Sequence, residues 1–145
     1  MARMIFVNLP VTDLQRSIAF YEAIGATNIP DFTDETAAMM SFSEAINVML
    51  LTHDNFRQFT PRPIADARET TGVLLALSAD SREAVDEIFA QALGAGGREF
   101  RAAEDYGWMY ARSFEDPDGH VWEPHWMDVA AAIQSKGEQP ETADA

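Results

Sequence analysis

The stretch FEDPDGHVWE at residues 114–123 contains the clearest turn signal in this 145-residue chain. Within it, proline fixes its own φ, aspartate can cap the local backbone, and glycine permits the positive φ that many tight turns require. Apolar and polar residues alternate on both sides of the turn. The pattern therefore predicts a β-hairpin with strands near 108–115 and 120–127.

The residues upstream of this hairpin predict a strand, a helix and a second, short strand. Residues 72–78 are mostly apolar, which is typical of a buried strand. Residues 81–93 have apolar side chains at helical spacing, and Gly94 follows as a helix C-cap. A short strand near 99–101 precedes the hairpin. This half of the chain therefore runs strand, helix and then three strands.

The first half of the chain repeats this order of elements. Its pattern predicts a strand at 4–11, a helix at 13–24, a short strand near 28–29 and a hairpin formed by 37–43 and 46–52. The sequence AIGA at 23–26 is echoed by ALGA at 92–95, at the ends of the two predicted helices. A repeat of roughly 70 residues indicates an internal duplication.

The repeat defines the expected domain organisation. We expect a single domain over residues 1–128, built from βαβββ modules at about 4–52 and 72–128 that residues 53–71 connect. Helices and strands combined in this way place the chain in the α+β class. Residues 129–145 are polar and acidic, so we expect them to form a disordered tail.

Net charge and composition narrow the classes of partner. The chain has 24 acidic and 10 basic side chains, which give a formal net charge of −14. This charge repels a phosphate backbone, so we expect no nucleic-acid partner. No run of about 18 apolar residues is present, so we expect no membrane contact through a spanning helix. The N-terminus lacks the apolar region of a signal peptide, and we expect a cytoplasmic protein.

Two motifs resemble a known family. The segment LPVTDL at 9–14, followed by SIAFY at 17–21, resembles the opening of the vicinal oxygen chelate proteins, the superfamily of glyoxalase I, bleomycin-resistance proteins and extradiol dioxygenases. The segment FEDPDG at 114–119, with Glu123 after it, resembles their closing hairpin. The resemblance covers about residues 4–128. It implies two modules whose curved mixed sheets surround a cavity, and it implies a homodimer.

The resemblance also identifies the positions at which the family's metal enzymes hold a divalent ion. These positions fall on Phe6, Met49, Leu74 and Glu123, one from each of four strands. Phenylalanine and leucine cannot ligate a metal, and a methionine thioether suits Cu(I) rather than the harder divalent ions. Glu123 alone is of a ligand type, and a single carboxylate is too little for a dedicated site. We therefore expect no metal and no other cofactor.

Strand alternation assigns further side chains to the cavity face. The face of the metal positions also carries Asn8. If the closing hairpin has a loop of two or four residues, Arg112 lies opposite Glu123 and Tyr110 lies opposite His125, all on this face. The residues expected to contact a ligand are Asn8, Met49, Tyr110, Arg112, Glu123 and His125, with Trp108 at the cavity mouth.

The roles of these side chains stay open at this point. Glu123 is a remnant ligand, a general base or an anchor for the bound molecule, or else it forms an ion pair with Arg112. His125 is either a proton relay or a packing residue. Trp108, with Tyr106, either closes the cavity mouth or makes an ordinary aromatic or dimer contact.

Two functions fit these observations, and a third is a scaffold with a vestigial cavity. The first is a protein that binds a small, partly apolar organic molecule in a metal-free cavity, as bleomycin-resistance proteins do. The second is a glyoxalase-type lyase or isomerase, similar to lactoylglutathione lyase, with an atypical or absent metal site. The three lost ligand positions favour the first. The sequence identifies neither a catalytic residue nor the bound molecule.

Overall fold

The computed structural model describes residues 2–138. In chain order, its elements are β1 (Ile5–Val11), α1 (Leu14–Ala23), β2 (Thr27–Ile29), η1 (Pro30–Phe32), β3 (Ala37–Ser41), β4 (Ile46–Thr52), α2 (His53–Phe56), η2 (Arg57–Phe59), β5 (Leu74–Ser78), α3 (Arg82–Gly94), β6 (Arg98–Asp105), β7 (Met109–Glu115), β8 (Val121–Met127) and α4 (Val129–Glu138). The strands and the two long helices predicted from the sequence are present. Their bounds agree to within two residues, except that β6 is longer than predicted.

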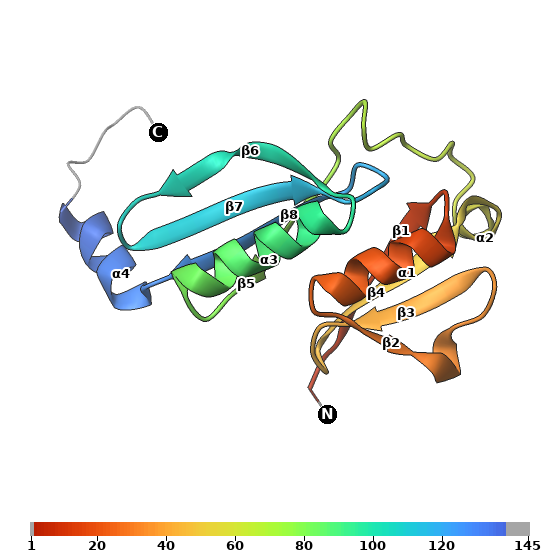
Figure 1. Cartoon of the computed structure of the whole chain (residues 1–145), viewed down its shortest axis with the longest axis horizontal. Coiled ribbons are helices and arrows are strands. Elements are labelled where there is room, and N and C mark those ends of the chain that lie inside the picture. Colours follow the sequence, from red (N-terminus) through yellow and green to blue (C-terminus); the bar gives the residue numbers. More distant parts are fainter. Residues whose placement is uncertain (1, 139–145) are drawn as a thin grey trace.

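Each half of the chain forms one mixed sheet with one long helix packed against it (Figure 1). The strand order is β1-β4-β3-β2 in the first sheet and β5-β8-β7-β6 in the second. In each sheet the first and last strands of the module pair in parallel, and the other pairs are antiparallel. The matching order confirms the predicted α+β fold of two βαβββ modules.

The core of the first module lies between its sheet and α1. Asp13 caps this helix, because its side chain accepts a hydrogen bond from the Arg16 N–H. Phe20 and Tyr21 on the helix are fully buried, as are Val48 and Leu50 on β4. Burial of each large apolar side chain contributes roughly 1.5–3 kcal/mol. The helix therefore covers one face of the sheet.

The second module is built in the same way and joins the first through a shared core. Val85, Phe89 and Ala92 of α3 are buried against the sheet. Where the modules meet, the Phe20 ring lies 6.0 Å from the Phe114 ring, between centroids, and α1 approaches α3 (Figure 1). The two modules therefore pack into one continuous core, on the helix side of both sheets.

The segment after β8 differs from the predicted disordered tail. Residues 129–138 form α4, and only 139–145 of the predicted tail lie outside the described residues. Asp128 explains the helix start, since its carboxylate accepts a hydrogen bond from the Ala131 N–H at 3.0 Å. The alanines that follow are strong helix formers. Among residues 2–138, no helix is both long enough and apolar enough to cross a membrane.

Candidate ligand-binding site

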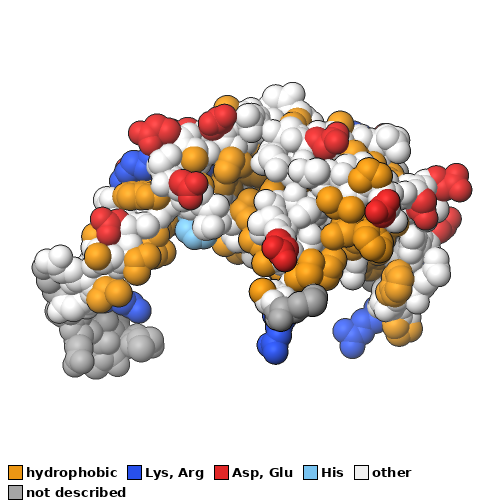
Figure 2. Space-filling model, turned by 90° about the horizontal axis from the view of Figure 1, so that it is seen from below, with side chains coloured by type: hydrophobic (Ala, Val, Ile, Leu, Met, Phe, Trp, Pro, Cys, Tyr) orange, Lys and Arg blue, Asp and Glu red, His pale blue; other side chains and the backbone are white. Residues whose placement is uncertain are grey.

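The face of each sheet that the helices leave uncovered is the candidate site. Seen from below, the molecule is arched, and hydrophobic side chains gather on its hollowed underside (Figure 2). Phe6 on β1 is 46% exposed and Leu74 on β5 is 47% exposed. Large apolar side chains that gather on one exposed face are a common feature of binding surfaces.

The first module contributes Phe6, Asn8 and Met49 to its open face. The parallel pairing of β1 with β4 sets Asn8 beside Met49 and Phe6 beside Asn47. The alternate residues Val7 and Leu9 pack toward the core, which fixes the direction of the others. The predicted placement of Asn8 and Met49 on one face is therefore confirmed.

The second module contributes Glu123 and His125. In the pairing of β5 with β8, Ala76 lies beside Glu123, and Ser78 lies beside His125. Within residues 2–138 the Glu123 carboxylate has neither a hydrogen-bond partner nor an ion-pair partner. The His125 ring makes one long contact, between Nδ1 and the Glu123 carbonyl oxygen at 3.5 Å. Glu123 is thus a half-buried carboxylate on the open face of β8.

The predicted ion pair between Arg112 and Glu123 is wrong, and the cause is the length of the turn. The antiparallel pairing of β7 with β8 sets Ala111, not Tyr110, opposite His125. The strands end at Glu115 and resume at Val121, so the loop has five residues and not two or four. A shift of one residue moves a whole strand's side chains to the opposite face. Tyr110 and Arg112 therefore lie on the helix side.

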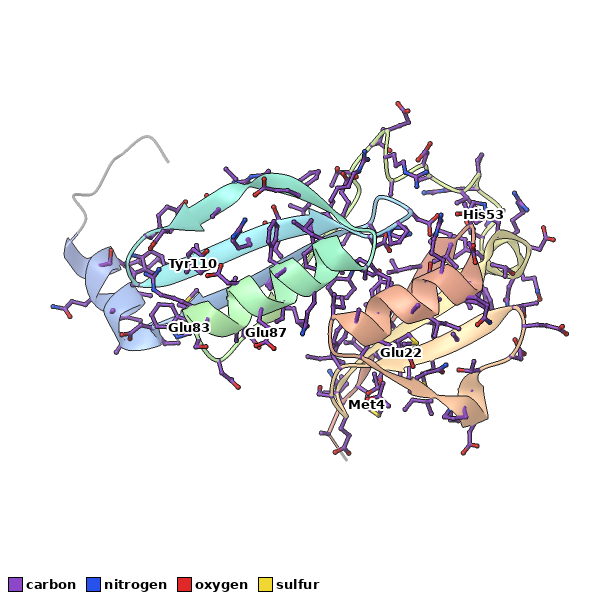
Figure 3. The ribbon with its side chains drawn as sticks, in the orientation of Figure 1. Met4, Glu22, His53, Glu83, Glu87 and Tyr110 are labelled. Atoms are coloured by element: carbon purple, nitrogen blue, oxygen red, sulfur yellow. The ribbon has the colours of Figure 1, made fainter. Side chains whose placement is uncertain are left out.

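On the helix side, Tyr110 and Arg112 have structural partners. The Tyr110 hydroxyl donates a hydrogen bond to Asp86 Oδ1 at 2.6 Å, and the stick view shows it between β7 and α3 (Figure 3). This bond raises the pKa of Tyr110 above its ordinary value. Arg112 lies 3.4 Å from Asp86 and 3.3 Å from Glu99, and its guanidinium stacks over the Phe89 ring at 3.7 Å. Both side chains therefore connect β7 to α3 through a hydrogen bond, an ion pair and a ring contact.

Trp108 lies just before β7, at the end of the second module that is remote from the first. Its ring is 5.6 Å from that of Tyr106, between centroids, and its carbonyl oxygen accepts a hydrogen bond from the Asp128 N–H. This stacked pair is partly exposed. Its role at a cavity mouth stays a prediction.

A cavity of about 190 Å³ opens beside Asn8. It lies between β1 and the starts of β5 and β8, and Phe56, Val73 and Val121 form part of its apolar wall. Asn8 is the one predicted ligand residue in the wall, whereas Met49, Glu123 and His125 lie on the open faces outside it. The sequence leaves two roles open for Phe56 in the connection, covering the cavity or filling a dimer interface, and its place in the wall agrees with the first. Val73 carries no motif that indicates a place in the wall.

The residues at the family's metal positions do not fit a divalent metal. Phe6 and Leu74 offer no donor atom, and Met49 offers only a thioether. Within the described part of the chain, no three His, Asp or Glu side chains gather closely enough to hold a metal ion. A single carboxylate at Glu123 cannot complete a four-ligand site.

Comparisons with known proteins agree with this fold. Residues 3–123 match the model of the Glyoxalase/Bleomycin resistance protein/Dioxygenase superfamily. A glyoxalase-related enzyme from Fulvimarina pelagi has a TM-score of 0.75 at 20% identity, over 100% of this chain and 96% of that chain. A hypothetical protein from S. aureus has a TM-score of 0.73 at 23% identity, over 87% and 94%. A fosfomycin resistance protein from Listeria monocytogenes has a TM-score of 0.66 at 19% identity, over 90% and 97%.

Identities this low show a shared fold and nothing about shared chemistry. No curated protein sequence matches the chain significantly. The family model, in contrast, spans the opening strand, both modules and the position of Glu123. On this match, and with its paired βαβββ modules, the chain belongs to the glyoxalase/bleomycin resistance protein/dioxygenase superfamily.

Proposed function

We propose that this protein binds a small, partly apolar organic molecule on the open faces of its sheets, without a divalent metal. The observation that carries the proposal is Glu123, a partnerless carboxylate on a face whose other family positions have become apolar. Phe6, Met49 and Leu74 supply hydrophobic contact where the family's metal enzymes supply ligands. Few polar groups on an apolar surface are the usual composition of a small-molecule site.

The polar contacts of the bound molecule come from Asn8, Glu123 and His125. Tyr110 and Arg112 are not among these ligand contacts, because their side chains point to the helix side of the sheet. Without Arg112, the only full charge on the set is that of Glu123. A lone carboxylate on an apolar surface favours a ligand with a basic group, and the net charge of −14 attracts such a ligand from a distance.

We also propose that a second copy of the chain covers the open faces, in a homodimer. The exposure of Phe6 and Leu74 on these faces supports the homodimer, because burying apolar side chains in an interface between two copies is favourable. The bound molecule then lies in the space between the faces of the two copies. A cytoplasmic location stays an expectation of the sequence.

A thermal-shift screen followed by calorimetry tests the binding proposal. The library contains matched basic and neutral aromatic or aliphatic compounds, each tested with EDTA and with added Ni²⁺, Zn²⁺, Mn²⁺ or Fe²⁺. We expect basic compounds to raise the Tm in EDTA, and Glu123→Gln to weaken their binding by at least about tenfold. Glu83→Gln is the matched control, because Glu83 is an exposed carboxylate on α3 (Figure 3). Binding that appears only with an added metal contradicts the proposal.

An enzymatic role is the second candidate. Glu123 and His125 lie two residues apart on the same face of β8, which suits a general acid and base pair. A glyoxalase-type lyase or isomerase would use Glu123 to abstract a proton. Turnover in a lactoylglutathione-lyase assay, abolished by Glu123→Gln, supports this role, whereas binding without turnover supports the first.

A further inference from the structure

A second cavity, of about 430 Å³, lies where the two modules and their connection meet. We call it the junction cavity. The end of β1 contributes Pro10 and Thr12, the connection contributes His53, Arg57 and residues 63–68, and the hairpin turn contributes Asp118 and His120. Figure 3 shows His53 at the start of α2, beside the connection. None of the residues on the open faces of the sheets to which the proposed function is assigned, such as Glu123 and Met49, lines this cavity.

The walls of the junction cavity are held by specific contacts between the modules. Asp118 Oδ1 accepts hydrogen bonds from the Thr12 N–H at 3.1 Å and from the Thr12 hydroxyl at 2.7 Å. His120 Nε2 donates to the Pro10 carbonyl oxygen at 2.8 Å. Arg68 donates a hydrogen bond to the Pro117 carbonyl oxygen across the connection. The cavity is thus a built space rather than a gap beneath a loose loop.

The cavity wall carries charged side chains of both signs, because Asp66 and Asp118 line it together with two arginines. Two of the chain's ten lysine and arginine side chains line the cavity, Arg57 and Arg68, and so do two of its three histidines. Arg68 is engaged with Pro117, whereas Arg57 forms an ion pair with the exposed carboxylate of Asp54 at 2.8 Å and has further N–H groups to donate. The His53 ring has no hydrogen-bond partner within residues 2–138. Arg57 and His53 are therefore available to an acidic group.

The same wall contains an acceptor that lacks a donor. The Asp118 side chain is 6% exposed; its Oδ1 lies 3.9 Å from the Arg16 guanidinium, whereas its Oδ2 is buried without a hydrogen-bond partner among the described residues. A buried carboxylate oxygen left unpaired costs free energy that a bound donor can recover. A simple anion cannot do this, because it would repel the carboxylate. The occupant must therefore carry a donor or a positive charge as well as an acidic group.

We propose that the junction cavity binds an α-amino acid with a small apolar side chain. Its ammonium group donates to Asp118, and its carboxylate meets Arg57 and His53. Pro63 and Ile64, which also line the cavity, receive the apolar side chain. The arrangement matches the two opposite charges of a zwitterion, and neither a plain acid nor a plain amine satisfies both ends.

Calorimetry with three probe classes tests this inference on the intact chain. The zwitterions are L-alanine, L-valine and L-leucine, while isocaproate lacks the ammonium group of leucine and isoamylamine lacks its carboxylate. We expect at least one zwitterion to bind, and both truncated probes to bind at least about tenfold more weakly. No heat from any zwitterion up to about 10 mM overturns the inference, and so does equal binding of isocaproate or isoamylamine.

Two variants test whether the amino acid binds in the junction cavity. Arg57→Gln changes an exposed side chain and should weaken amino-acid binding at least about tenfold. Arg62→Gln is its matched control, because Arg62 is an exposed arginine of the same connection that does not line the cavity. Asp118→Asn should also weaken binding, and circular dichroism checks that this variant folds. Unchanged affinity in Arg57→Gln assigns the binding elsewhere and overturns the inference.

Discussion

At the scale of single residues, Tyr21 forms a buried polar link between the modules. It is fully buried, its hydroxyl donates to Asp116 Oδ2 at 2.6 Å, and it accepts a hydrogen bond from Trp122 Nε1 at 3.0 Å. Burial and the nearby Asp116 charge raise the pKa of Tyr21 well above its ordinary value. The phenol therefore stays neutral and keeps its proton for Asp116, whose own pKa is raised by burial.

Removing the Tyr21 hydroxyl should destabilise the fold. In Tyr21→Phe, Asp116 loses a donor and Trp122 loses an acceptor in a dry environment, so we expect the free energy of unfolding to fall by about 1–3 kcal/mol. Urea denaturation followed by tryptophan fluorescence measures it. Tyr106→Phe is the control, because the Tyr106 hydroxyl bonds Glu104 at an exposed site. An equal loss in the free energy of unfolding in both variants would show that the buried hydrogen bonds of Tyr21 add no more stability than an exposed one.

At the scale of the elements, the closing hairpin shows what the sequence could and could not predict. Its position and strands followed from alternation and from the turn residues. Its register did not, because a five-residue turn and a four-residue turn have the same composition but opposite parity. Tyr110 and Arg112 were therefore assigned to the wrong face. The faces of Asn8 and Met49 followed from the family's metal positions and from strand alternation, which do not depend on this turn.

The turn itself requires glycine at position 119. Gly119 has a φ of 93°, and a Cβ there would lie 2.8 Å from the Arg68 backbone nitrogen. We expect Gly119→Ala to lower stability by roughly 1–3 kcal/mol. Gly94→Ala in α3 is the contrast, since a Cβ there meets nothing within 4 Å and helical alanine is favoured by about 0.5–1 kcal/mol. Thermal unfolding of both variants checks the opposite signs.

A surface clip joins the start of α3 to the end of β6 and gives a testable pH dependence. Two hydrogen bonds of 2.8 Å join Arg82 to Asp105, and they lower the pKa of Asp105 from 3.8 to about 2. A carboxylate with a depressed folded-state pKa contributes stability above 3.8 that is lost as the pH falls toward 2. The Tm of Asp105→Asn should therefore fall less steeply over this range. If the Tm of the parent chain and the Tm of Asp105→Asn fall in parallel over this pH range, the pair between Arg82 and Asp105 does not contribute to stability.

At the scale of the whole molecule, the proposed homodimer follows from apolar side chains that a lone chain leaves in water. Leu74→Asp places a charge on the open face of β5, where Leu74 is 47% exposed. We expect this variant to be a monomer at micromolar concentration, while the parent chain is a dimer by light scattering. Val129→Asp, at an exposed apolar site on α4, is the control and should stay dimeric. A monomeric parent chain contradicts the assembly.

We propose that the open face of this superfamily member carries apolar side chains and one carboxylate where the family's metal enzymes hold a divalent ion. Elemental analysis of the protein purified without chelators tests it most directly. Because Phe6, Met49 and Leu74 cannot ligate a hard divalent ion, we predict Ni, Zn, Fe and Mn each far below one atom per chain. Near-stoichiometric content of any of these metals, lost in Glu123→Ala, would show that the open face holds a metal ion.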